Sequence, residues 1–185
     1  MSIFGRKRNK EYEQAVRLLA DGQVDDAIRS LRIIVDENPG FTNALTSLGV
    51  AMIQSLGENK EDGHTITEAL EFLDRAASTN PKDPVPVFNK AVCLRELGRP
   101  NDAITAFEHV LELEERFALA ILHMAEINYE LENYEEAVDL ARLAAIRDPS
   151  TTATMSWVRD AMEKAGLLDE DGNPIDKPEG HPKMF

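Results

Sequence analysis

A chain of 185 residues with 43% apolar and 6% aromatic residues is too apolar to be disordered, and its many alanines, leucines and glutamates favour packed amphipathic helices over a sheet. The formal net charge is −14, and because the first ten residues hold four basic residues and no acid, the remainder sums to −18. Such an acidic body argues against binding to nucleic acid and favours neutral, apolar or basic partners.

The first ten residues, MSIFGRKRNK, form a short basic arm that contains Arg6, Lys7, Arg8 and Lys10. A chain end of this kind often frays, and the alternative is a contact with an anionic membrane or with an acidic surface of another subunit. We expect the first helix to run from about Arg8 to Ala20. Most of the arm is then predicted to precede the helical body.

The residues after the arm repeat at a fixed interval. Ala69, Ala103 and Ala137 are spaced 34 residues apart, and similar apolar and acidic residues surround each of them. We expect each alanine to lie where two helices cross closely, since a larger side chain there would push the helices apart. A helix pair repeated at this period cannot bury its apolar face alone, so neighbouring pairs are predicted to stack into a solenoid.

Four helix pairs and a cap are predicted along the chain. The repeats cover about 8–41, 42–83, 84–117 and 118–151, and a capping helix follows over 151–165. Pro39 ends the first repeat, while Asp83 is placed to cap the third repeat and Pro84 to begin its first helix. The predicted body therefore spans residues 8–166. The tail, 167–185, is rich in proline and is expected to be irregular, with an apolar end at Phe185 that could enter a groove of the same chain.

The second repeat is longer than the others. Ala27 and Ala69 are 42 residues apart, eight more than the period, and the surplus falls in a polar run near residues 58–66. Insertions in a surface turn cost little entropy. We therefore expect a longer loop there and no change in how the helices stack.

These residues resemble the tetratricopeptide repeat (TPR) family. The second repeat supplies its pattern with Leu45, Leu48, Gly49, Ala69, Leu73, Ala76 and Pro81, and the match extends over residues 8–165. The resemblance implies an all-α, right-handed superhelix: a solenoid of about four TPR helix pairs plus a C-terminal capping helix. The first repeat departs from the pattern, because Glu11 and Gln14 occupy positions that are usually apolar.

In this family the first helices line a concave groove that binds a peptide or a helix of another protein. The resemblance places the partner-binding groove of this chain at Tyr12, Val16, Leu19, Asn43, Thr46, Ser47, Val50, Phe88, Asn89, Val92, Arg95, Leu122, His123, Glu126, Tyr129 and Trp157. An apolar stripe edged by amides suits a segment with apolar anchors. The alternative is that the apolar members pack between adjacent helices and that Trp157 covers the preceding repeat.

One use of this family is to grip the C-terminal carboxylate of heat-shock chaperones with lysine, asparagine and arginine at set groove positions. The matching positions in this chain hold Asn89 but neither lysine nor arginine. A carboxylate needs charge-assisted donors to offset its desolvation. The groove is therefore predicted to be poorly suited to that task.

Catalytic and metal-binding patterns are lacking in the sequence. The four histidines fall in separate segments without a second ligand at helical spacing, and neither a glycine-rich phosphate loop nor a nucleophile elbow occurs. We expect no cofactor, no metal and no enzymatic activity. A single cysteine, Cys93, suggests a reducing compartment, and with no apolar signal run at the N-terminus a cytoplasmic location is expected.

The leading functional prediction is a non-enzymatic protein–protein interaction module that acts as an adaptor, a scaffold or a co-chaperone-like assembly factor. Its partner would be another protein, held as a peptide or helix in the concave groove. The alternative is a structural or self-assembling protein that associates with a membrane through its basic arm. The sequence leaves the identity of the partner and the oligomeric state open.

Overall fold

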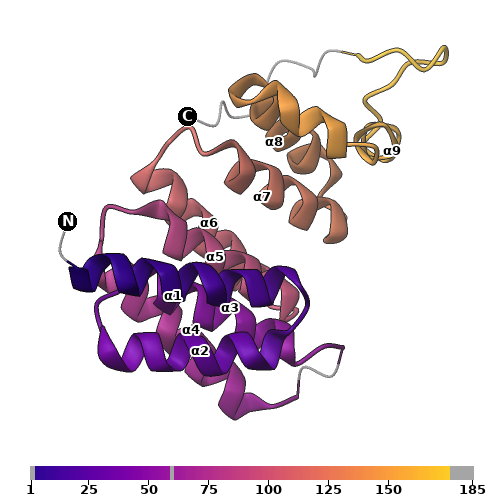
Figure 1. Cartoon of the computed structure of the whole chain (residues 1–185). Coiled ribbons are helices and arrows are strands. Elements are labelled where there is room, and N and C mark those ends of the chain that lie inside the picture. The colour runs from indigo at the N-terminus through magenta and orange to yellow at the C-terminus, as the bar shows by residue number, and fades with distance from the viewer. Residues whose placement is uncertain (1–2, 59–60, 176–185) are drawn as a thin grey trace. The chain divides into compact units, whose positions relative to one another are not determined.

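The computed structural model describes residues 3–58 and 61–175, and in these ranges every regular element is a helix (Figure 1). The predicted all-α class is therefore confirmed. The only β-type pairing in the described ranges is an isolated antiparallel bridge between Leu168 and Pro174. The chain divides into two compact units, Met1–Glu115 and Arg116–Phe185, here called the N-terminal unit and the C-terminal unit.

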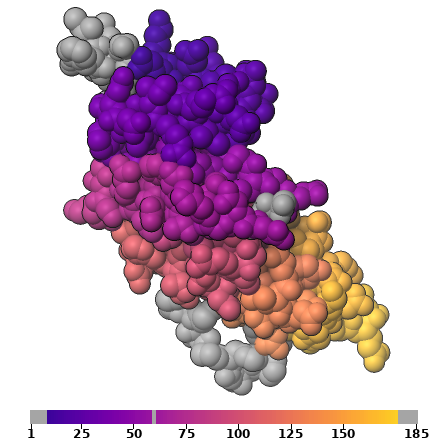
Figure 2. Space-filling view, turned by 90° about the horizontal axis from the view of Figure 1, so that it is seen from below, coloured from indigo at the N-terminus to yellow at the C-terminus, as the bar shows by residue number. Residues whose placement is uncertain are grey.

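Three helix pairs make up the N-terminal unit. Its helices are α1 (Ile3–Ala20), α2 (Val24–Glu37), α3 (Thr42–Ser55), α4 (Gly63–Thr79), α5 (Pro84–Glu96) and α6 (Pro100–Leu113). Each odd-numbered helix packs on the next helix in the chain, and α3 also contacts both α1 and α5. In Figure 2 the pairs form successive bands from indigo to pink. The first helices of the repeats therefore lie side by side on one face.

Small residues set the distance between paired helices. The repeated alanines, Ala27, Ala69, Ala103 and Ala137, are all fully buried. At Gly49 the approach is closer still, because a Cβ atom there would lie 2.7 Å from Leu73 Cγ and 2.8 Å from the carbonyl oxygen of Ala69. Only a hydrogen atom fits at position 49 without a shift of α4.

The surplus in the second repeat is divided between helix and turn. Helix α4 has 17 residues against 14 in α6, and α4 begins at Gly63 after α3 ends at Ser55, whereas only residues 97–99 separate α5 from α6. The prediction that a loop alone takes up the insertion was thus incomplete. Asp62 explains where α4 begins, since its side chain accepts hydrogen bonds from the backbone N–H groups of His64 and Thr65. A bond from the Thr65 hydroxyl and these backbone bonds hold the pKa of Asp62 below its ordinary value.

Helix α1 begins before the predicted start. Its backbone is helical from Ile3 rather than from Arg8, so most of the basic arm is the first part of α1. Lysine and arginine are good helix formers, and residues 6–10 contain no proline or glycine to stop the helix. Over residues 9–20 only Ala15 is fully buried, in keeping with the polar residues Glu11 and Gln14 beside it. The first helix is therefore held by few core contacts.

The C-terminal unit holds one helix pair and a cap. Its elements are α7 (Ala118–Glu130), α8 (Tyr134–Arg147), a 3₁₀ helix η1 (Pro149–Thr154) and α9 (Val158–Lys164). The single capping helix expected over 151–165 is instead divided between η1 and α9. Threonine hydroxyls explain the break, because Thr151, Thr152 and Thr154 each donate to a carbonyl oxygen three residues back. Such local bonds compete with a regular α-helix.

Residues 167–175 fold back onto the cap. Leu167 is buried in a cluster with Val138 and Ala161, and the Ile175 N–H donates to the Leu167 carbonyl at 3.0 Å. The first part of the tail therefore has a defined path, although the sequence predicts an irregular segment. The remaining tail residues, including the apolar end proposed as a groove ligand, lie outside the described residues.

Candidate protein-binding site

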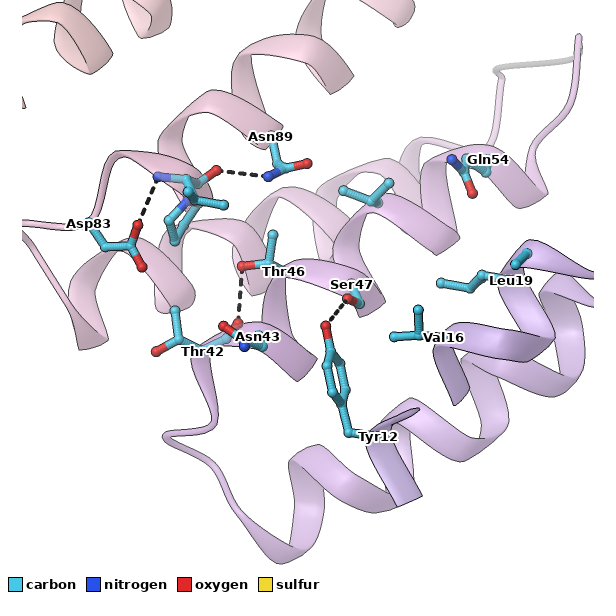
Figure 3. Close-up of a pocket in the computed structure, with 14 residues that line it drawn as sticks. Tyr12, Val16, Leu19, Thr42, Asn43, Thr46, Ser47, Gln54, Asp83 and Asn89 are labelled. Carbon is cyan, nitrogen blue, oxygen red and sulfur yellow. Dashed lines mark hydrogen bonds between the residues drawn. The ribbon is translucent and has the colours of Figure 1, made fainter. Parts of the chain in front are cut away.

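An open pocket of about 630 Å³ lies on the face formed by α1, α3 and α5 (Figure 3). It belongs entirely to the N-terminal unit. Its lining consists of Tyr12, Val16, Leu19, Ala20, Thr42, Asn43, Thr46, Ser47, Val50, Gln54, Asp83, Val85, Pro86 and Asn89. The pocket exists because the first helices of three successive repeats lie next to one another.

Eight of the predicted groove residues line this pocket. They are Tyr12, Val16, Leu19, Asn43, Thr46, Ser47, Val50 and Asn89. Three other predicted residues of α5, namely Phe88, Val92 and Arg95, are not in the lining. The Phe88 ring packs against Phe107 of α6 at a centroid distance of 5.7 Å, which fits the alternative of packing between adjacent helices.

Six lining residues are not among the residues predicted for the partner-binding groove, although Val85 occupies one of the positions compared with the carboxylate-gripping members of the family. The six are Ala20, Thr42, Gln54, Asp83, Val85 and Pro86. Thr42, Asp83 and Val85 lie at or next to the N-terminal end of α3 or α5. These three would have been predicted if the N-cap residue and the first turn of each repeat's first helix had been counted as part of the groove.

One side-chain hydrogen bond joins two walls of the pocket, and two others, each within one helix, fix polar side chains of the lining. The Tyr12 and Ser47 hydroxyls are 3.0 Å apart and join α1 to α3. The Thr46 hydroxyl donates to the Thr42 carbonyl at 3.0 Å. The Asn89 side-chain N–H group donates to the Val85 carbonyl at 2.8 Å, which turns the amide oxygen of Asn89 away from its own helix (Figure 3). The side chains are thereby oriented before any ligand binds.

Several polar side-chain groups of the lining form no hydrogen bond with the described residues. Within the part of the chain that the structure describes, the side-chain amides of Asn43 and Gln54 and the amide oxygen of Asn89 have no hydrogen-bond partner. A carboxamide offers both donors and an acceptor. These groups are therefore free to bind the main chain or the polar side chains of a ligand.

Apolar side chains are exposed in the same pocket. Val16 of α1 is 38% exposed and Val85 of α5 is 48% exposed. Complete burial of a valine or leucine side chain contributes roughly 1.5–3 kcal/mol. A ligand that covers both valines therefore gains a useful part of its binding free energy from these two contacts.

The charge of the pocket is set by one residue. Among the fourteen described residues of the lining, Asp83 is the only one with a carboxylate, and none is lysine, arginine or histidine. One oxygen of Asp83 accepts from the Val85 N–H at 3.0 Å, as expected for the cap of α5. A carboxylate ligand would find no charged donor in this lining.

The predicted groove residues of the C-terminal unit are held by neighbours within that unit. Leu122 is buried, and the His123 Nδ1 and Glu126 Oε2 atoms are 3.4 Å apart. The Tyr129 hydroxyl donates to Asp160 at 2.6 Å, and the Tyr129 ring lies 5.0 Å from the Trp157 ring. Trp157 thus packs on the preceding repeat, which is the alternative that the sequence left open.

Lys164 completes this aromatic cluster. Its ammonium group lies 2.8 Å from Asp160 and within 5.4 Å of the Tyr129 and Tyr134 ring centroids. The bond to Asp160 raises the pKa of Lys164, and the bonds from Lys164 and Tyr129 lower the pKa of Asp160. The same bond to Asp160 raises the pKa of Tyr129. We call these residues, Tyr129, Tyr134, Trp157, Asp160 and Lys164, the cap cluster.

Two other features bear on the class of site. Across residues 3–58 and 61–175, no group of three or more histidine, cysteine, aspartate or glutamate side chains is placed to hold a metal ion. In the same ranges, every helix is too short or too polar to span a lipid bilayer.

Two family models match the chain. The Tetratricopeptide repeat model matches residues 12–84, and the model of Anaphase-promoting complex, cyclosome, subunit 3, a TPR-type family, matches residues 62–142. The chain is a TPR protein. Repeats of this family generally serve as interaction modules that bind other proteins rather than as enzymes.

Curated relatives match about half of the chain. Hsp70-Hsp90 organizing protein 1 of Glycine max and Hsp70-Hsp90 organizing protein of Triticum aestivum are each 24% identical over 97 residues. The match covers 52% of this TPR protein but only 17% of each relative.

Solved structures agree with the fold over most of the chain. A thermophilic TPR protein of Thermus thermophilus has a TM-score of 0.72 at 19% identity, and the match covers 84% of this chain and 81% of that protein. The MamA protein has a TM-score of 0.67 at 16% identity, and the match covers 88% of this chain and 85% of MamA. At these identities the likeness shows the fold alone, and the predicted TPR solenoid is confirmed.

Proposed function

We propose that this TPR protein is a non-enzymatic adaptor that holds a linear segment of another protein in the pocket of its N-terminal unit. The observation that carries the proposal is the combination of exposed valines with unused carboxamides in one open pocket. Apolar anchors together with main-chain hydrogen bonds are the usual means by which proteins bind extended segments.

The length of the pocket limits the length of the segment. Along α3 the lining extends from Thr42 to Gln54, which corresponds to a rise of about 18 Å at 1.5 Å per residue. An extended chain advances by about 3.3 Å per residue, so five or six residues of a ligand fill the pocket, by this order-of-magnitude estimate. An interface of that size gives an affinity on the order of micromolar.

The names of the curated relatives favour a role in assembly. Both are named for organizing Hsp70 and Hsp90, and a co-chaperone-like role for this chain is part of the proposal. The lining without lysine or arginine argues that such a role would use a ligand other than a C-terminal carboxylate. A cytoplasmic location also remains part of the proposal, since the one cysteine of the sequence, Cys93, is buried and forms no disulfide in the described residues.

Capture of partners from an extract of the source cells tests the proposal. The intact chain is compared with a double variant, Val16→Gln with Val85→Gln, which makes both exposed anchors polar without adding charge. Ile33→Gln is the matched control, because Ile33 is 60% exposed on α2 and does not line the pocket. We expect a protein that the intact chain and the control retain and that the double variant loses.

Circular dichroism of the three proteins shows whether they share the same helix content. Equal retention by all three, with equal helicity, would show that partners bind elsewhere on the chain. Loss by both variants would also contradict the proposal, since the Ile33 substitution leaves the pocket lining intact.

A further inference from the structure

We propose that the bound segment carries a lysine or arginine side chain that pairs with Asp83, and apolar residues at the opposite end of the pocket. This inference rests on the proposed function and adds the chemical class and the direction of the ligand. The carboxylate of the lining lies where α3 and α5 begin, beside Val85 and Pro86, and the lining is uncharged where α1 ends. Figure 3 shows Asp83 and Leu19 at opposite ends of the pocket.

Asp83 is placed to receive a cation. Its Oδ1 atom accepts the Val85 N–H, whereas Oδ2 has no hydrogen-bond partner in the described part of the chain. Figure 3 shows the carboxylate at the same end of the pocket as Thr42 and Asn43. The neighbouring Lys82 is exposed and does not belong to the lining. A ligand cation can therefore bind the outer oxygen while the inner oxygen continues to cap α5.

The rest of the lining opposes an acidic ligand. A glutamate or aspartate side chain would approach Asp83 with no lysine, arginine or histidine among the fourteen lining residues to offset the repulsion. The acidic surplus of the whole chain acts in the same direction at longer range, because it attracts cations and repels anions.

The other end of the pocket selects for apolar residues. Figure 3 shows Val16 and Leu19 of α1 at the same end of the pocket as Gln54 of α3. Val50 of α3 adds a further apolar residue to the lining. A segment that binds in the reverse direction would place its cation against Val16 and Leu19, away from Asp83. The asymmetry of the lining therefore favours one direction of binding.

The experiment is selection from a phage-displayed library of random dodecapeptides on the full chain. We expect the selected peptides to be enriched in lysine and arginine and depleted in aspartate and glutamate relative to the starting library. The strongest peptide is then synthesised with an acetylated N-terminus and an amidated C-terminus, so that its charge comes from side chains only. Its affinity is measured by fluorescence anisotropy.

Asp83→Asn is the decisive variant. Asparagine caps a helix about as well as aspartate, so the substitution removes the charge and retains the bond to the Val85 N–H. We expect binding to weaken by about two- to fivefold, as for an exposed ion pair, and the difference to shrink in high salt. Asp62→Asn is the matched control, because Asp62 caps α4 and does not line the pocket. It should leave the affinity unchanged.

Failure of this inference is distinguishable from failure of the proposed function. In one contrary outcome, the selected peptides bind the double variant Val16→Gln with Val85→Gln more weakly and yet contain no basic residues. In another, they bind that double variant more weakly but bind Asp83→Asn as tightly as they bind the intact chain. Either result would overturn the charge preference and leave the pocket as the binding site. If no peptide is selected, or if the selected peptides bind that double variant unchanged, the proposed function and the inference both fall.

Discussion

The pocket of the N-terminal unit leaves polar and apolar side chains exposed without partners in the described ranges, whereas the cap cluster of the C-terminal unit pairs its side chains with one another. In the pocket, the amides of Asn43 and Gln54 have no partner among the described residues, and Val16 is exposed. In the cap cluster, the Tyr129 hydroxyl is bonded to Asp160, and the Trp157 ring lies against the Tyr129 ring.

The difference follows from position in the array. A terminal repeat has an apolar face with no further repeat to cover it, so its capping segment must supply the cover. The aromatic residues of the cap cluster therefore serve stability, while we propose that the face formed by α1, α3 and α5 binds a ligand. Residues at matching repeat positions need not share a function.

The substitution with the largest expected effect on the free energy of unfolding acts on the N-terminal unit and not on the C-terminal unit. Gly49→Ala places a Cβ atom 2.7 Å from Leu73 Cγ and should lower the free energy of unfolding of the N-terminal unit by about 2–3 kcal/mol. The single tryptophan, Trp157, lies in the C-terminal unit and reports on that unit alone. We expect the urea transition followed by circular dichroism to move to lower urea more than the transition followed by tryptophan fluorescence.

Gly40→Ala is the control for this substitution. A Cβ atom at Gly40 would meet only Thr79 Cγ2 at 3.9 Å, an ordinary contact. If Gly49→Ala unfolds at the same urea concentration as Gly40→Ala, then α3 and α4 are less tightly packed than their geometry indicates.

A smaller change in the free energy of unfolding, in the stabilising direction, is expected for a substitution in the turn between α7 and α8. Glu132 has a φ of 64°, a left-handed conformation that Gly98 adopts at the matching position one repeat earlier, with a φ of 69°. Glu132→Gly should raise the free energy of unfolding of the C-terminal unit by about 1 kcal/mol, because the strain of a side chain at positive φ is removed.

Tryptophan fluorescence during urea unfolding measures this gain. Glu130→Gly provides the contrast, since residue 130 lies within α7 and glycine there should destabilise the helix by about 1 kcal/mol. The same direction of change in both variants would contradict the role assigned to backbone strain.

A third prediction concerns the ion pair that joins α2 to α4. Arg32 donates to both carboxylate oxygens of Glu68, at 2.6 and 2.8 Å, and this bond lowers the pKa of Glu68. Both side chains are partly exposed, so solvent screens the pair, and Glu68→Gln should cost only about 0.5–1 kcal/mol at neutral pH.

The pH dependence of this effect has a definite sign. A lowered pKa means that the stabilisation is present above the ordinary pKa of glutamate and is lost as the pH falls through the lowered value. The difference between the wild-type chain and Glu68→Gln in urea unfolding should therefore disappear in acid. Glu71→Gln, an exposed change of the same kind on the same helix, is the control for the substitution itself.

The smallest effect on stability is expected for a substitution of Asp160 in the cap cluster. The bonds from Lys164 and Tyr129 lower the pKa of Asp160, so the contribution of Asp160 is present above its ordinary pKa and is lost as the pH falls below that range. An acid titration followed by Trp157 fluorescence should show a step that Asp160→Asn abolishes. Identical titrations of the two proteins would mean that Asp160 does not hold the cap in place.

Short-range spacing explains what could be predicted from the sequence. The alanine period places the helix pairs, and the Asp-Pro step at residues 83–84 marks the cap and start of α5, because both depend on residues close in the chain. Asp83 was recognised as a cap but not as a pocket residue. Its second role arises from the packing of α3 beside α5, which no local pattern encodes.

Competing local interactions account for two other differences. The threonines near residue 151 bond to their own backbone and divide the predicted capping helix. In the second repeat, the cap formed by Asp62 lets part of the insertion join α4. Both effects depend on which of two allowed local structures is more stable, a difference too small to judge from residue type alone.

The sparse packing of α1 has a consequence for ligand size. One wall of the pocket is formed by a helix in which, over residues 9–20, only Ala15 is fully buried, whereas α3 on the floor has many buried residues. The main ties of that wall are at Tyr12, whose hydroxyl lies 3.0 Å from the Ser47 hydroxyl and whose ring packs against Phe41 at a centroid distance of 5.2 Å. The size of the side chain that the pocket accepts should therefore depend on Tyr12, and loss of Tyr12 should let the wall move.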